Sequence, residues 1–587
     1  MLGERRARSV TADGTDDEAT GVLAVRGPRS LPALGRRLRG LAPPPGSSWR
    51  DPVIWTVAAT SFGAYFVISL YKLLQLAPSS YDLGIYTEFV KQLSQFHAPI
   101  VDVLAPGFNL EGNHFQIAVG VIAPFFRLFP TPATLLFFQA LFAAVSVFPV
   151  ATAAFALTTR GTGRLIAFAY GFSWGLQQMI EFDFHEIALA VPLLAFSVSA
   201  LARRRPAAAI AWAVPLVFVE ESQGFTVAAI GALLMASAAF PSLLRARPAP
   251  SAVGPDRRVR SRLPGWLRGR GGAGGGAGDY HRVALWGGLF LVAWGLFWST
   301  LAITVIIPHF NPTHQYYFWK DGGAVGGGKP FSVSRVLIQA GGGWPTKAQT
   351  LVLLLLPTAF AALGSPVALI ALPSLALRFI SPNTAYWGTA FHYNATVMPI
   401  LFIAAAEAIG RWRRSQALAW RTTPAGLAPA PPRPARSVLF APALALASRA
   451  RDRVHAAQTG LARYGGAMMA AVTVALAFQF PLGNLWQAST YKLDAHVAAA
   501  DAAMAVVPDG ATVQTTLDLL APLAARTDTF WIGTGGNPVT QYIVFDGQDS
   551  GYSPAITDVP QFIASTHPGD GYVMVFERDD VYVFRRG

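Results

Sequence analysis

The sequence predicts an all-α polytopic membrane bundle of about eleven transmembrane helices, followed by a small C-terminal extracytoplasmic α/β domain. The first observation is composition: 52% of the 587 residues are hydrophobic and only 13% are charged, about half the charged fraction of ordinary soluble proteins. The second is that many apolar stretches are long enough to cross a bilayer as helices. The third is that arginine gathers between alternate stretches. Together these observations exclude a soluble multidomain protein.

The chain begins with a polar segment, residues 1–52, that is rich in arginine and proline. It contains no apolar core of the signal-peptide type, so we expect a disordered basic cytoplasmic leader. The transmembrane domain, residues 53–482, opens with an apolar stretch at Val53–Leu76, long enough to cross a bilayer at about 1.5 Å per residue. The further predicted spans are Thr134–Leu157, Leu165–Met179, Ile187–Ala202, Ala207–Val219, Phe225–Leu244, Val283–Ile307, Ala348–Leu363, Val367–Ile380, Ala395–Ile409 and Ala467–Phe480.

The arginines indicate the orientation of these spans. Threading them alternately from a cytoplasmic N-terminus leaves six cytoplasmic segments: 1–52, 158–164, 203–206, 245–282, 364–366 and 410–463. These segments hold 33 of the 40 arginines, which is the bias that orients membrane proteins. The first loop (77–133) and the tail are therefore predicted to be external. The cytoplasmic loops 245–282 and 410–463 are low in complexity, and we interpret them as flexible linkers with affinity for anionic lipids.

Two apolar segments do not fit an ordinary span. Phe115–Phe129 has 15 residues and is interrupted by Pro124 and Arg127, so we predict an external helix lying on the membrane interface. Ala207–Val219 is short for a span and is expected to be tilted or broken.

The tail, residues 483–587, changes character. Helical patterning at Tyr491–Val507 and Leu517–Arg526 alternates with strand-like runs, which is typical of a small α/β domain. The predicted strands are Thr512–Thr516, Gln541–Asp546, Tyr572–Glu577 and Val581–Arg585, the last two joined by a hairpin at Asp579-Asp580.

Composition also excludes several kinds of site. The chain has no cysteine, which rules out disulfide scaffolds, zinc fingers, iron–sulfur clusters and thiol nucleophiles. The glycine run 269–278 lacks the Lys-Ser/Thr ending and the preceding strand of a phosphate loop. The net charge of +14 marks orientation in a membrane chain, so no nucleic-acid partner is expected.

Polar residues gather at the predicted external ends of the spans, where ionisable groups usually mark function. The segment Glu181–Glu186 places three carboxylates and one histidine in six residues. Asp183 and His185 share a side if the segment is extended, and carboxylate with imidazole suits a divalent cation. Glu220 and Glu221 interrupt apolar sequence on both sides, which is costly without a partner.

Each of these features also has a purely structural interpretation. A single acid at a helix end, such as Glu111 or Glu88, can be a cap or a solvated residue. His309 and His314 fit interfacial anchors, and the aromatic run Tyr316–Trp319 fits an interfacial belt. The acids of Glu181–Glu186 can serve structure alone.

At Tyr81-Asp82-Leu83-Gly84-Ile85-Tyr86 the chain resembles a bacterial multi-pass membrane family, domain of unknown function 2079. Further motifs that fit are Gly112-Asn113-His114-Phe115, Asp183-Phe184-His185, Glu220-Glu221, His392-Tyr393 before Pro399, and Thr512-Val513-Gln514 in the tail. Many relatives carry Lys-Glu-Asp where Val219-Glu220-Glu221 stands here. The resemblance covers residues 53–587 without the inserted arginine-rich loops, and it implies the bacterial cell membrane as location.

The loop layout in turn resembles the GT-C superfamily of membrane glycosyltransferases, which take sugars from polyprenyl-phosphate donors. This resemblance implies a catalytic base at Asp82. It implies that Asp183, His185 and Glu186 bind a divalent metal (Mg or Mn) or the donor phosphate. The residues expected to bind substrate are Tyr81, Tyr86, His114, Glu220, Glu221, His392 and Tyr393.

We therefore expect a membrane glycosyltransferase that moves a sugar from a polyprenyl-phosphate donor to an envelope acceptor at the external membrane face. One alternative is a transporter or flippase of a lipid-linked or anionic solute, which predicts acids near the bilayer midplane. A second is a non-catalytic envelope protein, which predicts that replacing the acids of Glu181–Glu186 is tolerated.

Overall fold

The computed structural model describes residues 47–240, 242–244, 277–316, 332–422, 441–548, 551 and 556–587. Almost all of the predicted leader, most of the loop 245–282 and residues 423–440 of the loop 410–463 lie outside the described residues. The structure does not address the predictions of disorder and of flexible linkers for those residues. Residues 410–422 and 441–463, which were predicted to belong to a flexible linker, are helical instead.

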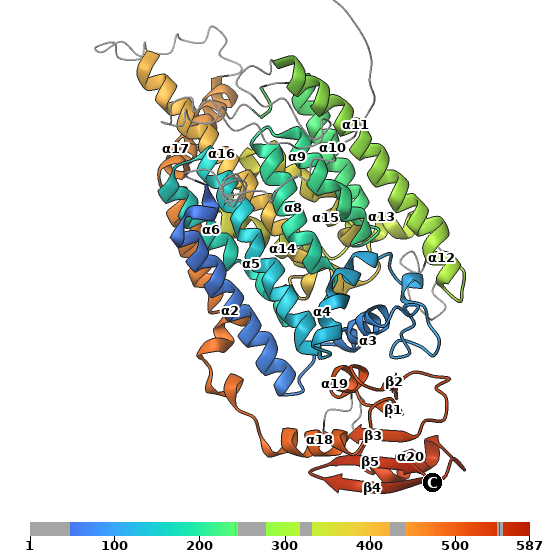
Figure 1. Cartoon of the computed structure of the whole chain (residues 1–587). Helices are drawn as coiled ribbons and strands as arrows, with labels where there is room; N and C mark the ends of the chain where they lie inside the picture. The colour runs from blue at the N-terminus through green and yellow to red at the C-terminus, as the bar shows by residue number, and fades with distance from the viewer. Residues whose placement is uncertain are drawn as a thin grey trace, which may run out of the picture. The chain divides into compact units, whose positions relative to one another are not determined.

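Helices make up the part that precedes the tail (Figure 1). They are α2 (Pro52–Leu74), α5 (Pro132–Leu157), α6 (Arg160–Gly171), α7 (Trp174–Glu181), α8 (Ile187–Ala202), α9 (Pro206–Ala213), α10 (Gln223–Ala239), α11 (Ala277–Leu301), α12 (Ile307–Phe310), α13 (Val333–Gly341), α14 (Trp344–Leu355), α15 (Leu372–Ile380), α16 (Val397–Thr422) and α17 (Ala441–Ala477). Several begin at the residues that sequence rules favour. Asp51 caps α2 by accepting from the Val53 amide at 3.1 Å, and the Thr131 side chain caps α5, each directly before a proline.

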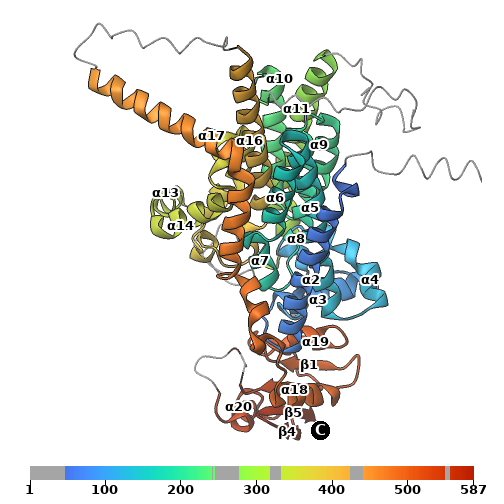
Figure 2. The same cartoon turned by 90° about the vertical axis from the view of Figure 1, so that its left-hand side faces the viewer.

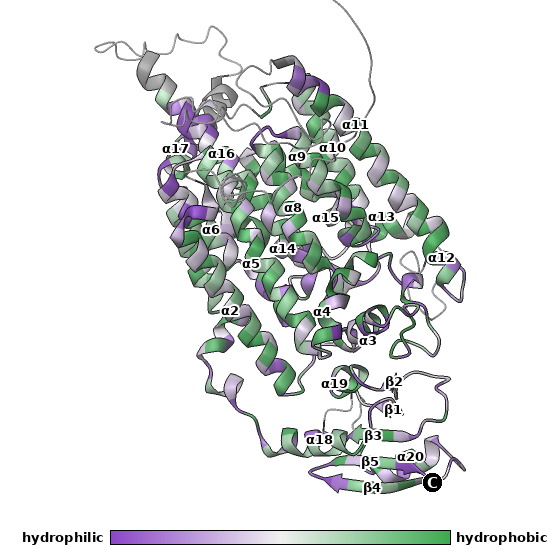
Figure 3. Ribbon diagram, in the orientation of Figure 1, coloured by the Kyte–Doolittle hydropathy of each residue, from purple (hydrophilic) through white to green (hydrophobic). Residues whose placement is uncertain are grey.

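Five helices of the described part are long and apolar enough to cross a membrane: Pro52–Leu74, Pro132–Leu157, Gly278–Phe310, His392–Ala417 and Ser448–Ala477. The most apolar window of His392–Ala417 is 94% buried inside the protein, whereas that of Gly278–Phe310 is 28% buried. The first therefore lies at the centre of the bundle, and the second turns a large apolar surface outward, as a lipid-facing helix does. Figure 3 shows hydrophobic residues along most of α2, α5, α8 and α11. Figure 2 shows α17 beside α16, which it contacts.

The other predicted spans correspond to shorter pieces. The stretch expected as Leu165–Met179 is divided into α6 and α7 by Ser173, whose backbone is extended (φ −66°, ψ 142°). Ala207–Val219 is broken, as expected, into α9 and a 3-10 turn at Val214–Phe218. Pro215 stands directly after the junction between α9 and the 3-10 turn, where its missing amide ends the helical ladder. Beyond the five long helices, the number of membrane-spanning segments thus stays a prediction.

The first loop, residues 77–133, which was predicted to be external, folds between α2 and α5. It contains α3 (Asp82–Ser94), 3-10 turns at Leu110–Gly112 and Ile117–Ile122, and α4 (Ala123–Leu128). The last two elements occupy the segment predicted as an interfacial helix. Apolar side chains remain exposed there, at Val121, Phe125, Leu128 and Phe129, as expected of a segment that rests on a membrane surface.

The tail forms the predicted α/β domain around one five-stranded sheet. Its strands are β1 (Thr512–Thr515), β2 (Asp528–Trp531), β3 (Tyr542–Asp546), β4 (Tyr572–Arg578) and β5 (Val581–Arg586), in the order β2-β1-β3-β5-β4. The first three are parallel and β5 joins antiparallel. The domain also contains α18 (Ala495–Ala505), α19 (Leu520–Ala524) and α20 (Val559–Thr566). The hairpin turns at Asp579 and Asp580, both at positive φ (49° and 64°), which fits a two-residue hairpin loop. Strand β2 and helix α20 were not predicted.

Helix α19 packs against α3. Gly84 allows this approach, because a Cβ there would lie 3.0 Å from the Leu520 Cβ. Lys91 donates to the Thr527 carbonyl at 2.6 Å, and Tyr81 stacks on Trp531 with ring centroids 5.6 Å apart. Helix α3 therefore contacts the α/β domain directly.

Candidate functional site

A cavity of about 170 Å³ collects most of the predicted site residues. Its polar wall comes from the first loop, the turn after α7, the segment before α10, and the segment that leads into α16. The polar and charged side chains that line it include His114, His185, Glu186, Glu220, Gln223, Tyr316, Arg378, Tyr386, His392 and Tyr393. Apolar lining comes from Ile187, Phe225, Ile303, Leu377 and Ile380. The cavity thus joins a titratable wall to an apolar one.

The turn Glu181–Glu186 is fixed by Gln139 of α5. The Gln139 carbonyl oxygen accepts from the His185 amide at 3.1 Å, and its amide group donates to the carbonyls of Met179 (3.2 Å) and Asp183. Asp183 has positive φ (74°), a conformation that costs free energy and persists only where neighbours determine it. The hydrogen bonds from the buried Gln139 hold Asp183 in this conformation.

Asp183 is not among the residues that line the cavity. It forms an ion pair with Lys72 of α2 at 3.0 Å and accepts from the Ser79 amide at 2.6 Å. Burial raises the pKa of Asp183, against the opposing effect of Lys72. The predicted metal set Asp183, His185 and Glu186 is therefore divided in the structure, because Asp183 already has a cationic partner. That set stays an untested prediction, and the geometry does not favour it.

His185 and Glu186 lie together on the cavity wall. The His185 Nδ1 is 2.5 Å from Glu186 Oε2, and the Tyr86 hydroxyl donates to the same carboxylate. Burial favours a raised pKa for Glu186, but the charge of His185 and the hydrogen bonds outweigh it and hold the pKa below its ordinary value. His185 also stacks on His392, with ring centroids 3.5 Å apart.

Asp82 lies at the first residue of α3, beside this group but not on the cavity lining. Burial raises its pKa, and the charges of His185, Glu186 and Asp183 act on it. The charge of Asp82 in turn acts on Tyr386, whose pKa is raised chiefly by the burial of the tyrosine itself and further by Glu220 and Asp82. Asp82 is thus close to the cavity wall. Its neighbour Tyr81 faces Trp531 instead.

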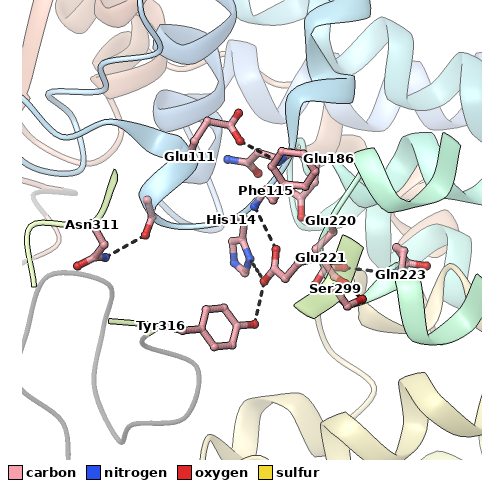
Figure 4. A network of polar contacts seen from close by, with 12 residues as sticks. Glu111, His114, Phe115, Glu186, Glu220, Glu221, Gln223, Ser299, Asn311 and Tyr316 are labelled. Carbon is pink, nitrogen blue, oxygen red and sulfur yellow. Dashed lines mark hydrogen bonds and ion pairs between the residues drawn. The ribbon is translucent and has the colours of Figure 1, made fainter. Parts of the chain in front are cut away.

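A second polar network surrounds Glu221, which is 1% exposed (Figure 4). Its carboxylate accepts from the Phe115 amide at 3.1 Å and the Tyr316 hydroxyl at 2.8 Å, and it contacts His114 Nδ1 at 2.9 Å. Single ligand atoms of His114, Glu220 and Glu221 all lie within 4.8 Å of one another. The two motifs, 107 residues apart, therefore meet at one point.

The pKa values in this network depart from their ordinary range. Burial works to lower the pKa of His114, but the adjacent Glu221 raises it to about 10. Burial and the charge of Glu221 raise the pKa of Glu220 to about 7. Burial raises that of Glu111 to about 7 as well, although it accepts from the Gln116 amide. Several acids of this network thus lie around one cationic side chain, that of His114.

Arg378 of α15 was missed by sequence reasoning. It donates to the carbonyls of Tyr386, Gly388 and Tyr393 and to the Asn394 side chain, which fixes the segment that leads into α16. Arg378 supplies the one guanidinium among the described residues that line the cavity. Its position in the sequence could have indicated a role, since Arg378 is one of seven arginines outside the predicted cytoplasmic segments.

Comparison with solved structures finds loose similarity over most of the chain. ArnT from Cupriavidus metallidurans bound to undecaprenyl phosphate is 14% identical, with a TM-score of 0.44 over 91% of this chain and 98% of that one. The apo form gives 0.46 at 13% identity over the same shares. The archaeal oligosaccharyltransferase AglB from Archaeoglobus fulgidus, in complex with an inhibitory peptide and a dolichol-phosphate, gives 0.31 at 14% identity over 90% and 74%. These solved structures resemble this chain only distantly, as the sequence-based comparison with GT-C enzymes also suggested.

Comparison with sequences gives the firmer result. No curated protein matches the chain. The family described as "Predicted membrane protein (DUF2079)" matches residues 72–428, which include the first loop, the turn Glu181–Glu186, the Glu220-Glu221 pair and His392. With more than half of its length matched, and with every residue of the cavity wall inside the match, the chain belongs to the DUF2079 family of membrane proteins.

Proposed function

We propose that this chain is a membrane glycosyltransferase that moves a sugar from a polyprenyl-phosphate donor to an envelope acceptor at the external membrane face. The observation that carries the proposal is the cavity described above, which joins titratable side chains to an apolar wall among helices suited to a bilayer. Such a cavity suits a substrate with a polar head and an apolar tail.

The two walls have different tasks in this proposal. Apolar residues such as Leu377 and Ile380 take the start of the lipid tail. Arg378 lies on the same helix, and four of its five N–H groups are engaged by described residues. The remaining Nη2 hydrogen is available to a phosphate oxygen, the group that guanidinium binds well.

Asp82 is the base in the proposed reaction. Its carboxylate takes the proton of the acceptor hydroxyl while that oxygen attacks the anomeric carbon. The bond from the anomeric carbon to the phosphate oxygen breaks, and polyprenyl phosphate leaves with the bonding electrons. A raised pKa favours a base that must accept a proton near neutral pH, and burial has that effect on Asp82.

The test is transfer from a panel of radiolabelled polyprenyl-phosphate sugars to endogenous acceptors in membranes. We expect Asp82→Asn to lose at least a hundredfold in transfer rate, within the range for a general base, with unchanged membrane insertion and thermal unfolding. The matched control is Asp509→Asn, whose carboxylate is largely exposed in the α/β domain. Full transfer by Asp82→Asn refutes the role of Asp82, and no transfer by the wild type from any donor refutes the proposed function.

The transporter alternative has less support from the geometry. It requires ionisable groups near the middle of spanning helices. The acids of the cavity wall, Glu186 and Glu220, precede α8 and α10 rather than lying within them. Their position favours chemistry at one end of the bundle.

A further inference from the structure

We propose that His114, Glu220 and Glu221 form a binding site for a divalent transition-metal cation, in a place distinct from the predicted set at Asp183, His185 and Glu186. Their ligand atoms lie within 4.8 Å of one another. An ion bound at about 2.0–2.2 Å from nitrogen and oxygen ligands needs these atoms to approach by a small further amount. In the described arrangement a hydrogen bond of 2.9 Å joins His114 Nδ1 to Glu221 Oε1, and an ion would replace the shared proton.

A buried, unpaired oxygen beside the cluster is an independent indication of a ligand. Gln223 is 4% exposed and lines the same cavity. Its amide nitrogen donates to Glu220 Oε2 at 3.2 Å, while its Oε1 has no hydrogen-bond partner among the described residues. Leaving a buried acceptor unpaired costs about 1–3 kcal/mol. A cation or its bound water at Glu220 would pair with it.

The surroundings also fit a positive ion. Glu186 acts electrostatically on both His114 and Glu220, and Glu221 acts in the same way on Glu111. Four carboxylates therefore gather in a largely buried region. Buried charges of one sign need a counter-charge, and a divalent cation supplies two units where His114 supplies at most one.

The ligands are held in place by further contacts (Figure 4). The Tyr316 hydroxyl and the Phe115 amide fix the Glu221 carboxylate, and Ser299 donates to its backbone carbonyl at 2.6 Å. Partners of this kind orient metal ligands in known sites. The His114 loop is fixed separately by Asn311, which donates to the Gly112 carbonyl at 2.9 Å.

The donor set indicates the class of metal. One imidazole with carboxylates suits Zn²⁺ or Mn²⁺ better than Mg²⁺, which prefers oxygen ligands alone. Three protein ligands with a cavity on one side leave a coordination position open, as in sites where the metal also binds water or a substrate oxygen. The inference rests on these contacts and does not depend on the proposed transfer reaction.

The experiment measures metal binding by the full-length chain in detergent. After chelator treatment, Zn²⁺ or Mn²⁺ is titrated and followed by calorimetry and by metal content after gel filtration. We expect about one equivalent in the wild type and at least a tenfold loss of affinity in both His114→Gln and Glu220→Gln. The matched control is His392→Gln, which changes a histidine of the same cavity outside the cluster and should keep wild-type affinity.

Thermal unfolding provides a second measurement, which can be made even on a variant that no longer binds the metal. The added metal should raise the unfolding temperature of the wild type and leave that of Glu220→Gln unchanged. This glutamine keeps the size of the side chain, and its contact with Gln223 can be retained. Absence of binding in the wild type, or wild-type affinity in both variants, would overturn the inference. Metal binding without any sugar transfer would leave this site standing and refute only the proposed function.

Discussion

The clearest thermodynamic test concerns Glu88 of α3, a carboxylic acid with 0% exposure. Its Oε2 accepts from the Val103 amide at 2.9 Å, and its Oε1 has no hydrogen-bond partner among the described residues. Burial raises the pKa of Glu88 to about 8, and the Val103 amide and Lys91 oppose that rise only in part. The side chain is therefore neutral in the folded protein at pH 7.

The expected magnitude follows from this pKa. A rise from 4.5 to about 8 corresponds to about 5 kcal/mol at about 1.36 kcal/mol per tenfold change in proton affinity, which is an upper limit because the structure can relax. Between these values the folded chain holds a proton that the unfolded chain lacks. Stability from this group is therefore complete below pH 4.5 and decreases as the pH rises towards 8.

Glu88→Gln keeps the neutral form at every pH. We expect it to match the wild type within about 1 kcal/mol at pH 5, because it retains an acceptor for Val103 and adds one unpaired donor. At pH 9 the variant should be more stable by a few kcal/mol. Thermal unfolding of the detergent-purified chain, followed by tryptophan fluorescence from pH 5 to pH 9, measures both.

The matched control is Glu577→Gln, which neutralises an exposed side chain of β4. The difference in unfolding free energy between this variant and the wild type should stay constant from pH 5 to pH 9. The reasoning about Glu88 is refuted if Glu88→Gln also leaves the pH dependence unchanged, since burial would then not raise the proton affinity in the folded state.

Two further substitutions test long-range contacts of the site. Lys72→Met should lower the free energy of unfolding by about 3–5 kcal/mol, because it leaves the buried Asp183 carboxylate without its cation. In a double-mutant cycle of thermal unfolding, adding Asp183→Asn should recover most of this loss. A Lys72→Met variant as stable as the wild type would contradict the pairing. Gly112→Ala should destabilise the first loop by about 1–3 kcal/mol, because its Cβ would lie 2.7 Å from the backbone of Phe310 and Asn311. The control Gly460→Ala meets no atom within 4 Å and should unfold at or above the wild-type temperature.

Local sequence patterns correctly predicted those helices and turns that depend on neighbouring residues in the sequence. Helix α8 occupies the residues that its apolar run indicates, and the Asp579-Asp580 hairpin lies where expected. Ser173 interrupts an apolar run that composition alone presents as continuous. Strand β2 lies at the edge of the sheet and pairs with β1 in parallel, a long-range contact that no local pattern records.

The candidate site shows the same division. The residue types at the cavity were predicted, because acids and histidines are conspicuous in apolar sequence. Their partners were not: Asp183 pairs with Lys72 and His114 with Glu221, across separations that no local pattern records. A metal site was accordingly expected among neighbours in sequence, whereas the compact His and Glu cluster is assembled from two loops.

Helix α3 connects the cavity wall to the α/β domain. One side of the helix presents Asp82 and Tyr86, the second of which donates to Glu186. Another side accepts α19 at Gly84 and places Lys91 against the Thr527 carbonyl, 436 residues later in the chain. Because a helix moves largely as a rigid unit, displacing α19 would also shift the carboxylate of Asp82. The position of the proposed base is thus determined jointly by the bundle and by a domain that contributes no residue to the cavity lining among the described residues.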